Sequence, residues 1–155
     1  MTTLTLDRFP PASAASPTLA LGASPELSLV LSAALAGANP QPDGLLLAGA
    51  DWPGDLPPLD VLSRLRAAHP HGKAVGLIVV AADVGRGAGT LARLNTLVRQ
   101  YGGLPVGPGV CVDAADIVAE ADGAAFADIT MPVRLALLGR RVATFARNRR
   151  ILRSA

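Results

Sequence analysis

Short, almost continuously apolar runs alternate along the chain with longer amphipathic stretches. Such a run predicts a strand buried on both faces of a sheet, and three stand at Gly44–Ala48, Ala74–Ala81 and Val106–Val112. Apolar residues three and four positions apart predict helices at Pro25–Ala36, Leu59–Ala68, Thr90–Tyr101 and Pro132–Leu152. Strands that alternate with helices of this length predict βαβ units, and therefore a parallel sheet with right-handed crossovers.

The first residues carry weaker patterns. Thr3–Asp7 alternates enough for a short strand, and the Pro-, Ala- and Ser-rich stretch up to Pro17 predicts a linker or mobile arm. A second short strand is predicted at Leu19–Leu21, and Ser24-Pro25-Glu26 has the N-cap, proline and acid typical of a helix start. We therefore divide the chain into an arm, residues 1–17, and one domain, residues 18–155.

The composition limits the class of protein. Half of the 155 residues are apolar and 17% are charged, which excludes intrinsic disorder, while the apolar runs are too short to span a membrane. Residues 1–7 lack the basic start and apolar core of an export signal. The single cysteine, Cys111, excludes an internal disulfide and fits a reducing compartment, so we expect a cytoplasmic protein.

Positive charge is concentrated at the C-terminus. Residues 134–155 hold seven of the 14 basic residues and no acid, although the formal net charge of the whole chain is only +2. Leu138, Val142, Phe145 and Leu152 form one face of the predicted helix. This arginine-rich helix, about 132–153, has several possible roles. It is a terminal helix with solvated arginines, or it binds an acidic partner or an anionic membrane surface, or it packs on the body of its own oligomer. Nucleic acid is disfavoured, because only one aromatic residue is interleaved.

Several segments together resemble a known family. They are Asp43–Ala48, Leu59–Leu65, His71–Val75, Gly85–Gly89 and Leu94–Gly103. In order and connecting residues they resemble the flavodoxin-like NAD(P)H-dependent FMN reductases, over about two-thirds of the chain.

The resemblance implies a fold and an activity. The fold is a three-layer α/β/α sandwich with a flavodoxin-like parallel sheet of four or five strands. The activity is hydride transfer between NAD(P)H and FMN bound at the carboxyl edge of the sheet, by a homo-oligomer (dimer or tetramer). Because the cofactor carries this chemistry, the sequence indicates no catalytic residue.

The chain departs from the family pattern on its N-terminal side and in the loop Ala50–Gly54, which does not keep the family's Pro-x-Tyr signature. The loop Gly22–Ser28 stands nearest to the family's phosphate loop, but Glu26 falls near the place of the family's arginine. Six residues between Gly37 and Gly44 cannot hold a helix and a strand. Either the second strand and helix are missing there, or Pro25–Ala36 is the second helix and the first strand is absent. In both cases the sheet is shortened.

Nine residues are the candidates for cofactor binding. They are Gly22, Ser24, Ser28, Trp52, Gly54, Gly85, Arg86, Gly87 and Gly89. Glycine-rich turns let backbone N–H groups approach a phosphate, and arginine adds donors. Gly85–Gly89 also fits an ordinary turn with a solvated arginine. Three roles are open for the Trp52 side chain: it stacks on a ligand, it anchors a subunit interface, or it packs its loop against the core.

The remaining chemical side chains favour structural roles. His69 and His71 lie at the amino edge of the sheet with no carboxylate nearby, so we expect no metal site. Cys111 is expected to be a buried thiol, and Asp113 and Asp116 to cap a short helix at Ala114–Ala119. The sequence thus leaves two hypotheses: an FMN reductase, or a non-catalytic flavodoxin-like module. Such a module would act in oligomerisation or partner binding through the Trp52 loop or the arginine-rich helix.

Overall fold

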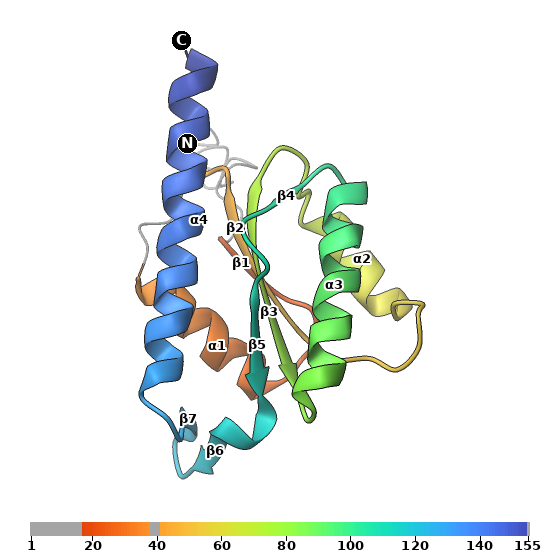
Figure 1. Ribbon diagram of the computed structural model, residues 1–155, viewed down its shortest axis with the longest axis vertical. Helices are drawn as coiled ribbons and strands as arrows, with labels where there is room; N and C mark the ends of the chain where they lie inside the picture. Colours follow the sequence, from red (N-terminus) through yellow and green to blue (C-terminus); the bar gives the residue numbers. More distant parts are fainter. Residues whose placement is uncertain (1–16, 38–40, 155) are drawn as a thin grey trace, which may run out of the picture.

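A parallel sheet lies between two layers of helices in the computed structural model, which describes residues 17–37 and 41–154 (Figure 1). The strands of this sheet are β1 (Thr18–Ala20), β2 (Gly44–Ala50), β3 (Ala74–Ala81), β4 (Leu104–Pro105) and β5 (Val110–Asp113). The helices are α1 (Pro25–Ala36), α2 (Leu59–Ala67), α3 (Val84–Gln100) and α4 (Thr130–Ser154). The predicted strand Thr3–Asp7 and the arm before Pro17 lie outside the described residues.

The sheet has the order β1-β2-β3, with β4 and β5 both paired to β3 along its other side. All of these pairings are parallel, as the sequence predicts. The single strand predicted at Val106–Val112 is wrong, because two short strands flank Gly107-Pro108-Gly109. Gly107 and Gly109 have φ values of 69° and 85°, and proline has no N–H to donate, so extended pairing stops there.

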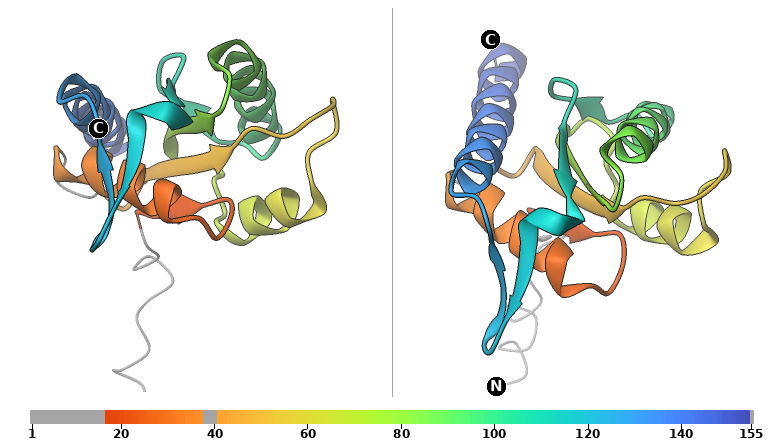
Figure 2. Two further views of the ribbon diagram at one scale, coloured as in Figure 1. Left: turned by 90° about the horizontal axis from the view of Figure 1, so that it is seen from below. Right: turned by 60° about the horizontal axis from the view of Figure 1, so that its bottom comes forward.

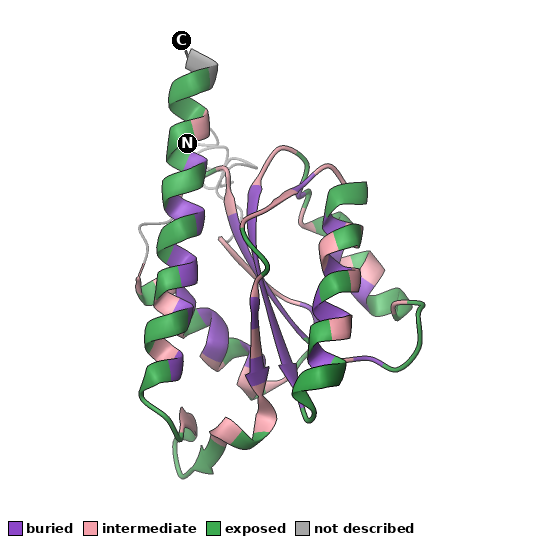
Figure 3. Ribbon diagram, in the orientation of Figure 1, coloured by how far each residue is buried: buried purple, intermediate pink, exposed green. Residues whose placement is uncertain are grey.

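Two apolar clusters cover the two faces of the sheet. Along β3, Val75, Leu77 and Val79 belong to the cluster that includes α2 and α3. Ala74, Ile78 and Val80 belong to the cluster that includes α1 and α4. Every residue of β3 is buried, which explains its unbroken apolar run (Figure 3).

The position of α1 explains how the fold is shortened. The connections through α1, α2 and α3 all step in the same direction along the sheet, yet α1 lies with α4 on the face opposite α2 and α3. The connection through α1 therefore has the opposite hand, so uniform right-handed crossovers were a wrong prediction. A flavodoxin-like sheet has the order 2-1-3-4-5. Removing its second strand and helix yields this topology, which favours the alignment with the loss between Gly37 and Gly44.

The segment between β5 and α4 differs from the prediction. A 3-10 turn, η3 (Ala114–Asp116), replaces the short helix predicted at Ala114–Ala119. It is followed by an antiparallel hairpin, β6 (Ile117–Glu120) and β7 (Gly123–Phe126). Figure 2 shows this hairpin standing out from the domain beside α1. Within the described part of the chain, no helix is both long and apolar enough to cross a bilayer.

Candidate functional site

The nine candidate residues follow three neighbouring strands at one edge of the sheet. Ligands of open α/β sheets bind at the carboxyl ends of the strands, at the point where the order of strands along the sheet changes direction. In Figure 1 this edge is at the bottom, where the strand arrowheads end. Gly22, Ser24 and Ser28 follow β1, Trp52 and Gly54 follow β2, and Gly85–Gly89 follow β3. The fold therefore brings the three groups to one edge, as the sequence predicts.

The start of α1 is occupied by the chain's own carboxylate. Ser24 is the N-cap residue, but its hydroxyl donates to Oε2 of Glu26 and caps no backbone N–H. This hydrogen bond, followed by one from the backbone N–H of Glu26, holds the pKa of the Glu26 carboxyl below its ordinary value. An ionised carboxylate thus stands in the first turn, where the helix dipole would attract a phosphate. Ser28 lines a hollow of about 230 Å³ between β1 and α1.

The loop after β2 pairs with the start of α3. The Nε of Arg86 lies 3.7 Å from Oδ2 of Asp51, and the Asp51 side chain is only 18% exposed. Asp51 is in turn fixed by a 3.2 Å hydrogen bond from its N–H to the carbonyl oxygen of Val80. The guanidinium proposed for phosphate binding therefore already faces a carboxylate.

Gly85–Gly89 forms the first turns of α3, which corrects the prediction of a glycine loop before a helix starting at Thr90. Asp83 is the N-cap, and its Oδ1 accepts from the N–H of Gly85 at 2.8 Å. A Cβ on Gly87 would lie 2.4 Å from Sγ of Cys111 and 2.8 Å from Cβ of Ala81. Because Gly87 has no side chain, α3 can pack closely on the sheet at this position.

Trp52 is buried. Its side chain is 5% exposed and belongs to the apolar cluster on the α2 and α3 face. Its Nε1 is one of three buried side-chain polar atoms without a hydrogen-bond partner among the described residues. Gly54, at φ 79°, turns the exposed loop beyond it. A buried indole has no face on which a flavin ring can stack.

Taken together, the residues at this edge do not fit flavin mononucleotide as they stand. Three donor groups that a phosphate would use face carboxylates of the chain: the Ser24 hydroxyl, the Gly85 N–H and the Arg86 guanidinium. A phosphate at the Ser24 turn would lie beside Glu26, and one at the Gly85–Gly89 turn would lie beside Asp83 and the partner of Arg86, Asp51. Like charges at such short range repel.

The remaining titratable side chains singled out in the sequence make contacts that support the fold. Cys111 is half-buried, where a buried thiol was expected, and its Sγ lies 3.9 Å from the carbonyl oxygen of Val84. Burial raises the pKa of the Cys111 thiol, and the charges of Asp113 and Asp51 raise it further. Asp113 caps η3 through the N–H of Ala115 at 2.9 Å. No three His, Cys, Asp or Glu side chains in the described ranges are grouped to hold a metal.

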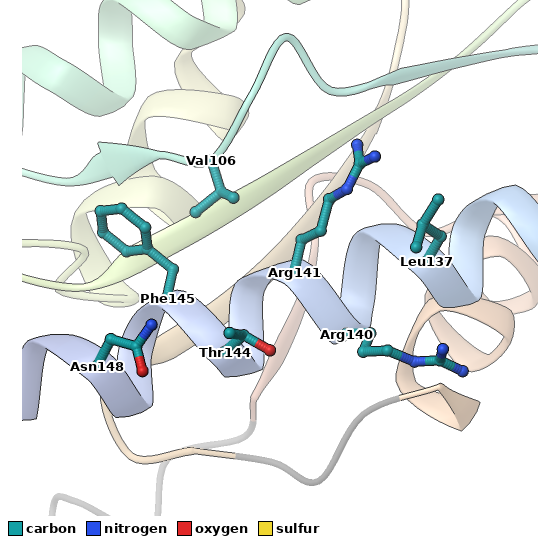
Figure 4. Close-up of a pocket in the computed structure, with 7 residues that line it drawn as sticks. All are labelled: Val106, Leu137, Arg140, Arg141, Thr144, Phe145 and Asn148. Atoms are coloured by element: carbon teal, nitrogen blue, oxygen red, sulfur yellow. The ribbon is translucent and has the colours of Figure 1, made fainter.

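A second candidate surface runs along α4. A cavity of about 360 Å³ opens there, lined by Val106, Leu137, Arg140, Arg141, Thr144, Phe145 and Asn148 (Figure 4). A smaller cavity of about 160 Å³ shares Val106, Leu137 and Arg141 and continues to the Gly107-Pro108-Gly109 turn. We name the two together the α4 groove. The predicted apolar face of this helix is divided, because Leu138 and Val142 are buried whereas Phe145 is 42% exposed.

The arginines beside the α4 groove form no ion pair with an acid among the residues that the structure describes. The two ion pairs among the described residues are Arg64–Asp60 and Arg86–Asp51, and neither involves α4. Arg149 donates to the carbonyl oxygen of Gly72 at 3.0 Å. Arg134, Arg140, Arg141 and Arg147 are exposed. The sequence indicated these charges, but only the fold shows that three of them, Arg134, Arg140 and Arg141, line an open apolar groove.

The chain was compared with family models, with curated proteins and with solved structures. No match was found in any of the three comparisons. The similarity to FMN reductases, carried by segments such as Asp43–Ala48, therefore stays a prediction from sequence.

Proposed function

We propose that this chain is a flavodoxin-like protein-assembly module that docks a partner on the α4 groove, and that it does not act as a flavin reductase. One observation carries the proposal. The α4 groove combines apolar side chains with exposed arginines that have no carboxylate within ion-pair distance in the described chain, whereas the donors at the carboxyl edge are already paired.

The composition of the α4 groove suits a protein surface. Phenylalanine and arginine are enriched where proteins bind one another, and a guanidinium binds a carboxylate through two parallel hydrogen bonds. Leu137 and Phe145 are each about 40% exposed, so apolar area remains to be covered. The partner that fits is a segment with one or two apolar side chains beside carboxylates.

Titration with FMN tests the part of the proposal that says the chain does not act as a flavin reductase. We expect no saturable change in Trp52 fluorescence and no heat of binding at millimolar FMN, because Glu26 and Asp51 oppose the phosphate and Trp52 is buried. Saturable binding at micromolar FMN, with reduction of the bound flavin by NADH or NADPH, would return the chain to the reductase hypothesis.

Binding of an anionic apolar dye, anilinonaphthalene sulfonate, tests the part of the proposal that says the α4 groove is a docking surface. At low protein concentration the dye should bind saturably, because the groove offers apolar surface beside arginine. Arg141→Glu and Phe145→Asp should each weaken dye binding at least about tenfold, since a full charge pair or apolar contact contributes on that scale. Arg66→Glu, the same charge change at an exposed site on α2, is the matched control. Equal dye binding by all four proteins would contradict the proposal.

A further inference from the structure

The hairpin β6–β7 and its flanks carry the charge opposite to that of α4. Between Arg99 and Arg134 the sequence has five acids and no base, and from Arg134 onward it has seven arginines and no acid. The five acids are Asp113, Asp116, Glu120, Asp122 and Asp128. The chain therefore places an acidic element directly before a basic one.

These two elements do not neutralise each other within one chain. The hairpin is joined to the start of α4, and the helix runs away from it toward the opposite end of the molecule (Figure 1). Arg147 lies 17 residues beyond Thr130, about 26 Å along the helix axis. Neither ion pair among the described residues joins the two elements. A separate molecule can bring its hairpin to the arginines farther along the helix, Arg140 and Arg147.

Exposed apolar side chains are concentrated on the same two elements. Seven of the ten large exposed hydrophobic residues in the described chain lie between 118 and 152. They are Val118, Ile129, Val133, Leu137, Phe145, Ile151 and Leu152. On β6, Val118 and Glu120 share one face because alternate residues of a strand point the same way. One face of the hairpin thus offers an apolar side chain beside a carboxylate.

The arrangement of charges on α4 decides which element of a second copy can lie on it. Arg134 and Arg141 are seven residues apart, as are Arg140 and Arg147, so the helix carries two arginine rows. Val133 and Leu137 lie between these rows. Direct packing of α4 on α4 would bring like charges together, which is destabilising. The acidic hairpin meets no such repulsion.

We infer that the partner docked on the α4 groove is a second copy of this chain, whose β6–β7 hairpin places Glu120 and Asp122 against Arg140 and Arg147. This inference rests on the proposed function. Both copies carry both elements, so the contact is made twice in a closed two-fold dimer. Glu120 and Asp122 are exposed at the hairpin tip and so can reach a neighbour.

Complementary charge reversal tests the inference. One variant, Glu120→Arg with Asp122→Arg, has a basic hairpin; the other, Arg140→Glu with Arg147→Glu, has an acidic α4. Sedimentation velocity should show that the wild type forms dimers, while each variant alone raises the dimer dissociation constant at least about tenfold. An equimolar mixture of the two should return to within about threefold of the wild type, because both contacts become attractive again. Asp55→Arg and Arg66→Glu, exposed sites elsewhere, are the controls.

Salt and dye give independent readouts. Raising the salt from about 0.1 M to 1 M should dissociate the dimer, because screening shortens from about 10 Å to 3 Å. Dye fluorescence per chain should fall as the protein concentration rises and the groove is covered.

Three results would overturn the inference: a monomer at all concentrations, a dimer that both variants retain, or a mixture that does not recover. If the protein stays monomeric and dye fluorescence per chain stays constant, a second copy is rejected as the partner, but the docking surface is retained. Failure of the dye to bind at low concentration would reject the docking surface itself.

Discussion

At the carboxyl edge of the sheet, donors that a phosphate would use face carboxylates of the same chain, whereas four exposed arginines along α4 form no ion pair with any residue in the described ranges. Both regions contain cationic and apolar side chains, and both were candidate sites in the sequence. The difference is where the counter-charge lies. A donor paired within the chain supports folding, and one without a partner remains available for binding.

The largest expected effect separates the buried side of α4 from its exposed side. Leu135 is fully buried and Leu137 is 41% exposed, two positions along the same helix. Leu135→Ala should reduce the free energy of unfolding by about 2–5 kcal/mol, because it leaves a cavity in the core. Leu137→Ala should cost less than about 1 kcal/mol, because its surface is already partly in water. Urea unfolding measures both, and equal losses would mean that the α4 groove belongs to the core.

The next effect concerns the glycines of the carboxyl edge. Gly87→Ala should cost about 1–3 kcal/mol, because the new Cβ meets Cys111 and Ala81 in a packed interior. In a Cys111→Ala background the loss should shrink, since the closest contact is gone. Gly89→Ala, where the added Cβ comes no closer than 3.6 Å to Arg93, should instead stabilise the helix by about 0.5–1 kcal/mol. A Gly87→Ala protein as stable as the wild type would argue for an open cradle at this edge.

A smaller effect is expected at the cap of α3. Asp83→Ala removes the acceptor for the Gly85 N–H and should lower the free energy of unfolding by about 1 kcal/mol. Asp83→Asn keeps an acceptor oxygen and should retain most of that stability. If both substitutions left thermal unfolding unchanged and created a phosphate site, the donors at this edge would be functional ones.

The smallest effect is chemical and leaves stability unchanged. Because burial and the charge of Asp113 raise the pKa of the Cys111 thiol, little thiolate exists near neutral pH. Alkylation by iodoacetamide should therefore be slower than for a free cysteine and should increase only at more alkaline pH. Asp113→Asn, which keeps the capping oxygen, should lower the thiol pKa and shift the rate profile toward lower pH. A profile that Asp113→Asn does not move would contradict the assigned cause.

The continuous apolar runs made the central strands predictable. In β2 and β3 every second residue faces one helix layer and the rest face the other, so both sets must be apolar. The helix α4 was predicted within two residues at each end.

Other elements could not be read from local pattern. Glycines at 85, 87 and 89 predict a loop by propensity, yet all three lie in the first turns of α3, after the Asp83 cap. At Gly87 there is no room for a side chain between the helix and the sheet. The β6–β7 hairpin was missed because its strands are rich in alanine and lack β-branched alternation; β7 packs beside α1.

The sequence by itself determined the alternation of strands and helices and the separation of acids from arginines along the chain, because both are properties of order and composition. Only the tertiary structure decided which arginine faces a carboxylate. That choice depends on distances between segments far apart in sequence, such as Asp51 and Arg86, and on the direction in which α4 leaves the acidic hairpin. Coulomb energy falls with distance, so a count of charges cannot say which of them remain to bind another molecule.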